Sequence, residues 1–266
     1  MTVDSTLRRD GSTATDDLVA AHAGLAAPER SRVLAALETV RDPELDEPIT
    51  SLGFVASCTV SDGGDVSVRL RLPTYFCAPN FAFLMVADAF DAVSAVPGVG
   101  RADIVLEDHF ASDAINGGVA ARAGFVDAFA GEAESDLRAL RADFLRKAVM
   151  AGTHLVCRPL VADGMTPEKL AGLALGDVPP SPELDRLRRR RIDLGLPAGD
   201  DAALLIDPAS GEAVGAGAIP MHLRRARTTH VNIDANTSIC RGMFAHRYNA
   251  AHGTTVDERN ESEEAT

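Results

Sequence analysis

Apolar and polar residues alternate most regularly in the stretch from Val66 to Leu72. Every second residue there is apolar, and a period of two is typical of a strand that is buried on one face. A second run of strand-forming residues covers positions 54–60, and an Asp-Gly-Gly turn at 62–64 separates the two runs. The pattern therefore predicts a β-hairpin.

Helical spacing of apolar residues is found on both sides of this hairpin. Upstream, Val33, Leu37 and Val40 recur at that spacing. We expect this helix to begin near Pro28 and to end at Asp42-Pro43, because a residue before proline is disfavoured in the α region. Downstream, a helix is predicted over 80–96 and a third strand over 102–106. The order α-β-β-α-β predicts a small α/β (α+β) domain with a mixed sheet.

The chain beyond this domain is predicted to be a mainly helical extension. An Ala- and Leu-rich segment at 125–150 has helical periodicity. Two apolar runs, at 203–206 and 213–219, flank an Asp-Pro-Ala-Ser-Gly turn and predict a second β-hairpin. We expect four regions: a disordered tail at 1–26, the α/β domain at 27–112, a C-terminal partner-recognition domain at 113–256 and an acidic disordered tail at 257–266.

Composition and charge narrow the functional classes. The 266 residues are 46% hydrophobic, which suffices for a sizeable core, and carry a net charge of −13. This acidic balance opposes general binding to nucleic acid. No stretch approaches the roughly 18 to 20 apolar residues of a membrane span, and the N-terminus has no apolar signal region, so we expect a cytoplasmic protein. Without a Walker motif or a GxGxxG motif, no nucleotide cofactor is indicated.

The four cysteines offer the clearest candidate chemistry. They are too widely spaced for a disulfide framework or a self-contained zinc finger. Cys77 lies between the alternating strand and the following helix, where the positive end of the helix dipole favours the thiolate and hence metal binding or nucleophilic attack. The alternative is a small hydrophobic residue packed at a corner. Cys58 falls in the first predicted strand and Cys157 lies in an apolar run, and both are predicted to be packed.

Additional metal ligands are predicted in two places. Asp42 and Glu44 could orient the thiol or supply oxygen ligands, although Asp-Pro-Glu is also an efficient helix stop and turn. Imidazole and thiol ligands recur near the C-terminus, where His230, Cys240 and His246 are the main candidates. Their spacing is irregular, and surface histidines in an Arg- and Asn-rich extension explain them without a metal.

An arginine run is the candidate partner-binding surface. It comprises Arg186, Arg188, Arg189, Arg190 and Arg191. Such a run is usually a solvated helix face, but in an acidic protein it could dock a partner. A protein partner is favoured over nucleic acid because no aromatic residues are interleaved for base stacking.

Four short motifs in order give the α/β domain a resemblance to a known family. They are Val-Arg-Asp-Pro-Glu-Leu at 40–45, Ile-Thr-Ser-Leu-Gly-Phe-Val at 49–55, Pro-Thr-Tyr-Phe-Cys at 73–77 and Val-Pro-Gly-Val at 96–99. Over roughly residues 29–108 the chain resembles the iron–sulfur assembly family that includes the SufT and the phenylacetate-pathway PaaD proteins. Those relatives usually place proline directly after the thiol, whereas Ala78 intervenes here.

The resemblance implies a non-catalytic role. It points to a metal-centre (iron–sulfur or di-iron) assembly or maturation factor, acting through Cys77 on iron or a transient iron–sulfur cluster and dedicated to a client oxygenase. Other iron–sulfur assembly proteins are the alternative partners, and a homodimer is expected by analogy. A single cysteine cannot hold a cluster, so dimerisation, another ligand or a client thiolate is required.

Two other functions remain open from the sequence. One is a metal-independent folding chaperone or adaptor for an oxygenase subunit, in which Cys77 is structural. The other is a thiol-dependent enzyme with Cys77 as nucleophile. That enzyme needs a base, and the α/β domain offers only His109, which nothing in the sequence places beside Cys77.

Overall fold

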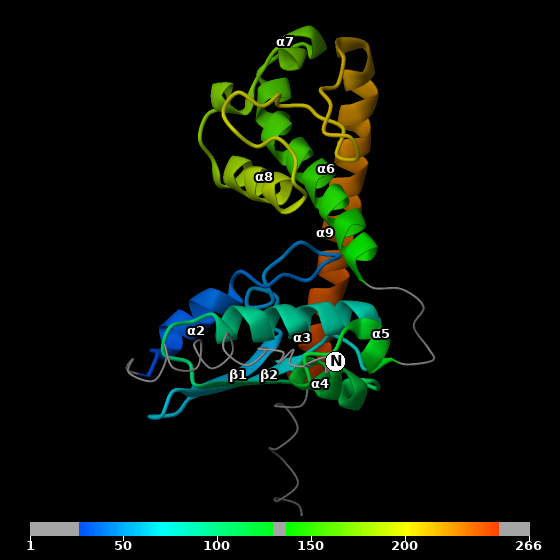
Figure 1. Ribbon diagram of the computed structural model, residues 1–266. Helices are drawn as coiled ribbons and strands as arrows, with labels where there is room; N and C mark the ends of the chain where they lie inside the picture. Colours follow the sequence, from blue (N-terminus) through cyan, green and yellow to red (C-terminus); the bar gives the residue numbers. More distant parts are fainter. Residues whose placement is uncertain (1–26, 130–136, 250–266) are drawn as a thin grey trace, which may run out of the picture.

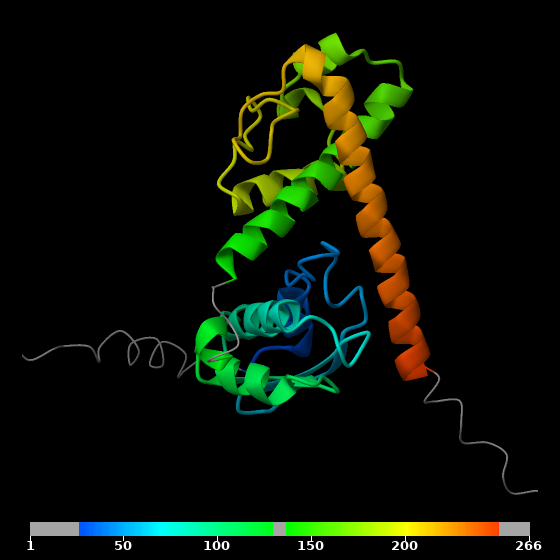
Figure 2. The same cartoon turned by 90° about the vertical axis from the view of Figure 1, so that its right-hand side faces the viewer.

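Two lobes, stacked on each other and joined along one side by a long helix, make up the described part of the chain (Figure 1). The computed structural model describes residues 27–129 and 137–249. We call residues 27–129 the first lobe. The second lobe begins at residue 137 and includes the N-terminal half of the long helix, whose C-terminal half returns to the first lobe (Figure 2). The predicted disordered tails lie outside the described residues.

The first lobe is built on a mixed sheet of strands β1 (Val55–Val60), β2 (Asp65–Arg71) and β3 (Arg101–Glu107), in that order. Strands β1 and β2 are antiparallel, and β2 and β3 are parallel. The helix between β2 and β3 supplies the crossover that a parallel pair requires. The predicted fold class, a small α/β domain with a mixed sheet, is confirmed.

The two faces of the sheet differ as the alternation predicts. On the inner face, Val68 and Leu70 are buried. On the outer face, ion pairs connect the parallel strands, with Arg69 3.0 Å from Asp103 and Arg71 2.9 Å from Glu107. The outer face therefore stays partly open to solvent, and the core lies on one side only.

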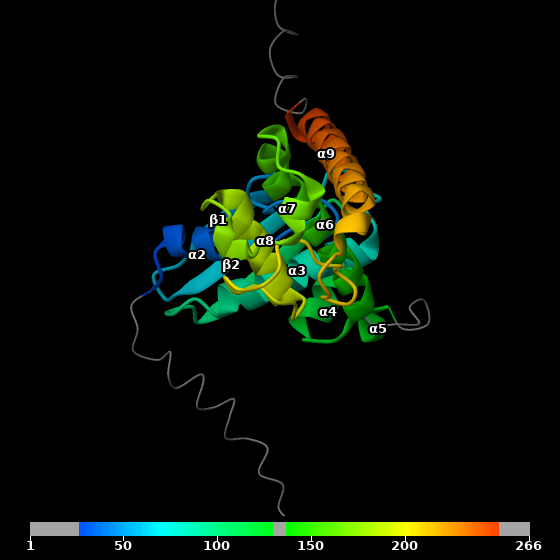
Figure 3. The ribbon, with the colours of Figure 1, turned by 90° about the horizontal axis from the view of Figure 1, so that it is seen from above.

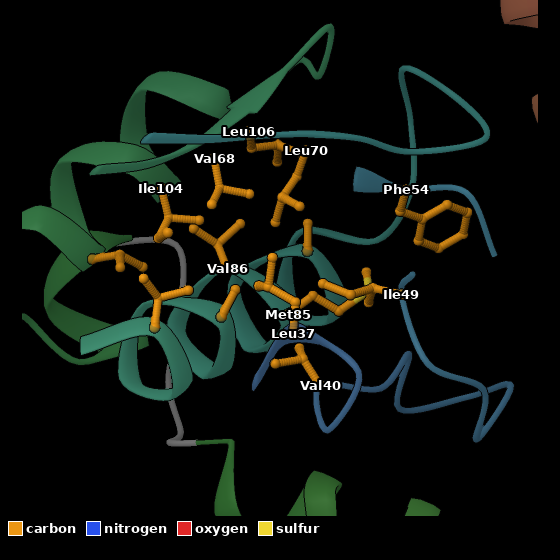
Figure 4. Close-up of a cluster of buried hydrophobic side chains, with 14 of the residues drawn as sticks. Leu37, Val40, Ile49, Phe54, Val68, Leu70, Met85, Val86, Ile104 and Leu106 are labelled. Carbon is orange, nitrogen blue, oxygen red and sulfur yellow. The ribbon is translucent and has the colours of Figure 1, made fainter. Parts of the chain in front are cut away.

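Helices α2 (Arg30–Leu37) and α3 (Pro79–Ser94) cover the inner face. Figure 4 shows Val68 and Leu70 of the sheet pointing toward Met85 and Val86 of α3. Helix α2 ends at Leu37, earlier than the predicted stop at Asp42-Pro43, because the next residues tighten into i→i−3 bonds, such as the one from the Val40 N–H to the Leu37 carbonyl.

The first core continues past residue 112, where we expected the domain to end. Helices α4 (Ser112–Ala120) and α5 (Phe125–Ala128) follow β3. Ile115 and Val119 of α4 are buried in the same core as the sheet residues, and Phe125 of α5 packs against it. Both helices therefore belong to the first lobe.

The second lobe has a hydrophobic core of its own. It contains α6 (Arg138–Ala162), α7 (Pro167–Ala171), η1 (Leu175–Asp177), α8 (Pro182–Asp193), η2 (Ala216–Ala218) and the start of α9 (Ile219–Asn249). Val156, Leu187 and Leu204 are among its buried residues. The helix predicted over 125–150 is instead two helices, α5 and α6. Seen from above, this lobe lies over the first (Figure 3).

The second hairpin is reduced to a single antiparallel bridge between Ile206 and Ala213. The run 215–218 is Gly-Ala-Gly-Ala, whose small side chains leave little to pack on a strand pair. It forms the turn η2 and leads into α9, a helix of 31 residues. Across residues 27–129 and 137–249, none of the helices combines the length and the apolar character that crossing a lipid bilayer requires.

Candidate functional site

Cys77 lies in the loop between β2 and α3. The thiol is half-buried, Ala78 is the N-cap residue and Pro79 begins the helix. Thr74 Oγ1 lies 3.3 Å from Cys77 Sγ and also accepts a hydrogen bond from the Phe76 N–H at 3.2 Å. The Thr74 hydroxyl thus fixes the loop around the sulfur.

His109 lies directly beside the Cys77 loop, a contact that we did not predict. Its Nε2 is 2.7 Å from the Cys77 carbonyl oxygen, and its Nδ1 accepts the Ala111 N–H at 3.2 Å. The Nε2 nitrogen therefore bears the proton and donates a hydrogen bond to the Cys77 carbonyl. Burial is the main cause that lowers the pKa of His109. Because backbone groups engage both ring nitrogens, the imidazole positions the loop and is not directed at the thiol as a base.

The parallel pairing of β2 and β3 explains this contact. Arg71 at the end of β2 is in register with Glu107 at the end of β3, so the two following loops leave the sheet at the same edge. The Phe110 N–H donates to the Tyr75 carbonyl at 3.1 Å and ties the loops together. The predicted α-β-β-α-β order already indicated that these two loops would meet, because the carboxyl ends of parallel strands lie at the same edge of a sheet.

Asp42 and Glu44 have different roles in the turn before β1. Asp42 is buried, and one of its carboxylate oxygens accepts the N–H groups of Glu44 and Leu45, both at 2.9 Å. Burial raises the pKa of Asp42 to about 6. Glu44 faces α9, where the Asn236 side-chain amide donates to it at 3.2 Å. Asp42 therefore organises the turn, and Glu44 links it to the long helix.

One face of α9 packs on the first lobe beside Cys77. Asn236, Cys240, Phe244 and Tyr248 recur at every fourth residue and so share a face. The Phe244 ring lies 5.5 Å from the Phe54 ring.

The same helix face approaches the backbone closely. A side chain at Gly53, whose φ is +79°, would meet the Phe244 ring at 3.4 Å. The Tyr248 hydroxyl donates to the Leu72 carbonyl at 3.3 Å. Cys240 is thus held between two anchored turns of the helix.

Acidic groups surround the Cys240 thiol. The pKa of Cys240 is raised to about 11, chiefly by burial and to a lesser extent by electrostatic repulsion from Asp42, Cys77 and Glu44. Of the predicted ligand residues, Cys77, Asp42 and Glu44 therefore lie within electrostatic reach of Cys240.

The other predicted ligands do not join them. His230 lies in the second lobe, where its ring centroid is 5.2 Å from that of His154, and ten residues place it about 15 Å along the helix from Cys240. His246 is exposed and lies about 120° around the helix from Cys240. Within the described residues, no group of three or more His, Cys, Asp or Glu side chains is arranged to hold a metal ion.

Cys58 and Cys157 are packed as predicted. Cys58 lies in β1 opposite Val68 and is buried in the first core. Cys157 is buried in α6, and burial raises its pKa to about 12. Neither thiol is presented to a ligand.

The five arginines of the predicted partner-binding surface differ in how far they are buried. Arg191 is fully buried and donates to the carbonyls of Ala203 and Leu204 at 2.9 and 2.5 Å. Arg190 is also buried and pairs with Asp46 at 2.6 Å.

Arg188 pairs with Asp200 at 2.7 Å. Arg186 is half-exposed and Arg189 is exposed. Of the five arginines, only Arg189 is exposed, and Arg188 differs from the half-exposed Arg186 by its ion pair with Asp200.

Sequence reasoning missed an exposed aromatic cluster beside the thiol. Tyr75, Phe76 and Phe110 have exposed fractions of 47%, 77% and 49%. The Phe76 ring lies 5.0 Å from Tyr75 and 6.0 Å from Phe110 between centroids. Phe76 and Phe110 lie in the two loops that meet at the sheet edge. The parallel pairing of β2 and β3 could therefore have predicted that these two rings lie close together.

Comparison with known proteins identifies the domain that presents Cys77. Residues 30–104 match the family described as iron–sulfur cluster assembly protein. Over 84 residues the chain is 32% identical to an uncharacterized protein of Methanocaldococcus jannaschii, an alignment that covers 32% of this chain and 86% of that protein. The chain belongs to the iron–sulfur cluster assembly protein family through this domain.

A second relative is an iron–sulfur cluster carrier protein of Mycobacterium leprae. It is 34% identical over 82 residues, which are 31% of this chain and 21% of the carrier protein, so this chain spans about a fifth of that relative. No solved structure matches the chain. Helices α6 to α9 lie outside the family match.

Proposed function

We propose that this protein is an assembly or maturation factor for a metal centre and acts through the Cys77 thiol. The observation that supports this most is the placement of a half-buried thiol in a fixed loop of a domain that belongs to the iron–sulfur cluster assembly family. Iron or an iron–sulfur cluster is the cargo in this proposal, and the role is not catalytic turnover.

An open site suits transfer better than storage. A closed set of four protein ligands traps a metal, whereas an incomplete set leaves positions for a receiving protein. The described residues contain no closed metal site. Cys77 would thus hold cargo that a partner can remove.

The partner would dock on the aromatic cluster beside the thiol. Exposed apolar patches rimmed by polar residues are typical of protein–protein contacts, and aromatic residues dominate such contacts energetically. Tyr75, Phe76 and Phe110 border Cys77, and Arg186 and Arg189 would add contacts from the second lobe. We propose a client oxygenase component or another iron–sulfur assembly protein as the partner, with a homodimer as a further proposed state. The four free cysteines fit work in the reducing cytoplasm.

Anaerobic reconstitution with ferrous iron and sulfide tests the proposal. Wild-type protein should bind iron and transfer a cluster to apo-ferredoxin, whereas Cys77→Ser should keep the fold, measured by far-UV circular dichroism, and lose most of the transfer. Cys58→Ala is the matched control, because it removes a thiol buried in the same lobe. Full iron binding and transfer by Cys77→Ser would refute the thiol mechanism.

The client can be identified from native cells. The partner captured with this protein should contain less iron when this protein is absent. A partner that aggregates but still takes up iron normally would instead favour a metal-independent chaperone.

A further inference from the structure

A cavity of about 330 Å³ lies between the two lobes. Arg41, Asp46 and Leu84 line it from the first lobe, and Phe144 of α6 and Arg190 of α8 line it from the second. Figure 1 shows α8 and the start of α6 above the first lobe at this level. The volume is at the lower end of the range that is typical of small-molecule sites, so a small organic molecule fits.

The lining of this cavity contains a buried donor without a partner. The Arg190 side chain is only 10% exposed, and its Nε pairs with Asp46 at 2.6 Å while its Nη1 pairs with Asp193 at 2.9 Å. The Nη2 nitrogen is buried as well and has no hydrogen-bond partner within the described residues. Leaving a donor of a buried charged group unpaired is costly, and such groups nearly always have an acceptor. An acceptor in the cavity would remove this cost.

Arg41 supplies a second cation at the same place. Its Nη1 donates to the Asp46 carbonyl at 2.6 Å, so both guanidinium groups bond the same residue. Asp46 has a φ of +53°, which is uncommon for a residue other than glycine, and the two arginine bonds hold it in that conformation. Because a carbonyl carries no net charge, the positive charge of Arg41 remains available to an anion.

Other groups already bond the four carboxylates of the lining, which are Asp42, Asp46, Asp88 and Asp193. Asp88 makes two 2.7 Å bonds with Arg141. Asp46 and Asp193 both bond Arg190, and Asp42 accepts two backbone N–H groups at 2.9 Å. These pairings leave the Nη2 of Arg190 and the charge of Arg41 for a ligand.

An apolar surface completes the lining. It is formed by Leu84 of α3 and by Phe144, Leu145 and Ala148 of α6. The Phe144 ring is held edge-on against the Phe81 ring at 5.0 Å between centroids. A hydrocarbon chain on this surface would be removed from water, which favours binding in proportion to the apolar area buried.

We infer that this cavity binds a small monocarboxylic acid, with its carboxylate on Arg41 and Arg190 and its hydrocarbon chain against Phe144. A carboxylate supplies both the acceptor that Arg190 Nη2 lacks and a negative charge between two cations, and charge-assisted bonds of this kind are the strong ones. The ligand contacts both lobes and therefore stabilises their attachment. This inference goes beyond the proposed function and does not depend on Cys77.

Isothermal titration calorimetry of the full chain with hexanoate tests the inference. Hexanoate should bind at one per chain and about tenfold more tightly than hexanamide, which has the same chain without the charge. Acetate lacks most of the hydrocarbon and should bind about 100-fold more weakly than hexanoate. Equal affinities for hexanoate and hexanamide, or no saturable binding of hexanoate, would overturn the inference.

Two variants test whether the ligand lies in this cavity. Arg41→Gln should weaken hexanoate about tenfold and leave hexanamide unchanged, because it removes the charge alone. Ala148→Leu fills part of the cavity and should weaken both probes alike. Arg189→Gln, at an exposed position outside the lining, is the matched control and should bind both as wild type does.

Far-UV circular dichroism checks that each variant is folded. If Arg41→Gln does not fold, the comparison of hexanoate with hexanamide on wild type and on Ala148→Leu still decides. Wild-type affinity for hexanoate in folded Ala148→Leu would mean that the ligand binds elsewhere and would overturn the inference.

Hydrogen exchange adds a measurement that does not depend on the affinities. Hexanoate should slow exchange both at residues 41–46 and at the start of α6, because the ligand contacts both lobes. Protection in one lobe alone contradicts a ligand held between the two. Cys77→Ser should bind hexanoate as wild type does, so failure of cluster transfer would refute the proposed function and leave this inference standing.

Discussion

The two lobes differ in how their charged side chains are used. In the first lobe, the sheet ion pairs are half-exposed and lie on an open face. In the second lobe, Arg190 and Arg191 are buried and bond groups within the chain. A family domain with an open thiol loop is thus joined to an extension whose interior depends on buried arginines. The extension therefore adds directional polar contacts as well as apolar packing.

The attachment between the lobes has polar and aromatic parts. Arg190 of α8 pairs with Asp46 at 2.6 Å, and Arg141 of α6 makes two 2.7 Å bonds to Asp88 of α3. The Phe144 ring packs edge-on against Phe81 at 5.0 Å between centroids. These contacts of α6 and α8 add to those that α9 makes with the first lobe.

The largest expected effect comes from breaking the buried pair. Arg190→Ala leaves Asp46 buried without its cation, and we expect a loss of about 3–5 kcal/mol in the free energy of unfolding. Urea unfolding followed by far-UV circular dichroism measures it.

Matched variants sharpen this prediction. Asp46→Asn combined with Arg190→Met removes both charges and should recover most of the loss. Arg189→Ala, at the exposed neighbouring position, should change stability by less than about 0.5 kcal/mol. Equal losses for Arg189→Ala and Arg190→Ala would show that burial does not distinguish the two arginines.

A smaller effect is expected from Asp42, a buried carboxyl of the first lobe. Its folded pKa of about 6 lies above the 3.8 of an unperturbed aspartate side chain, so the folded state holds a proton that the unfolded state releases. The resulting stabilisation is complete below pH 4 and is lost as the pH rises through 6. At pH 7 the ionised carboxylate costs about 3 kcal/mol.

Asp42→Asn removes this pH-dependent cost and keeps an acceptor oxygen for the Glu44 and Leu45 N–H groups. The variant should be more stable than wild type at pH 7 by up to about 3 kcal/mol, and the difference should shrink toward pH 4. Urea titrations across this range provide the comparison, with the exposed Asp62→Asn as control. A constant difference at all pH values contradicts the prediction.

The smallest effect is expected where α9 meets the Cys77 loop. Tyr248→Phe removes the 3.3 Å bond to the Leu72 carbonyl, a loss of about 1 kcal/mol. Because local opening exposes the thiol, alkylation of Cys77 should accelerate about fivefold, measured by mass spectrometry under native conditions. An unchanged rate would mean that this end of α9 does not limit access to Cys77.

The sequence predicted the first lobe better than the second for a physical reason. Strand alternation and helical spacing in the first lobe follow a single core, so Val68 and Leu70 point inward as expected. Cys58 was also placed correctly in that core. The end of α2 was misjudged because a 3₁₀ tightening closes it before the proline is reached.

In the second lobe, α9 had no continuous apolar face to detect. Its N-terminal half packs on the second lobe and its C-terminal half packs on the first, so its apolar residues follow two partners (Figure 2). The burial of Arg191 likewise could not be predicted from the sequence, because an arginine run is typical of a solvated helix face. The contact between His109 and Cys77 could have been predicted from the parallel strands. The approach of Cys240 could not, because it depends on where α9 returns.

The position of α9 at the end of the described chain has a consequence during synthesis. The first lobe is complete once Phe129 has been made, whereas α9 ends 120 residues later, at Asn249. At roughly 5 to 20 residues per second, the ribosome needs about 6 to 24 s for this interval. Throughout that time the newborn first lobe presents the Cys77 loop without the hydrogen bonds that Arg247 and Tyr248 of α9 later make to its flanking backbone.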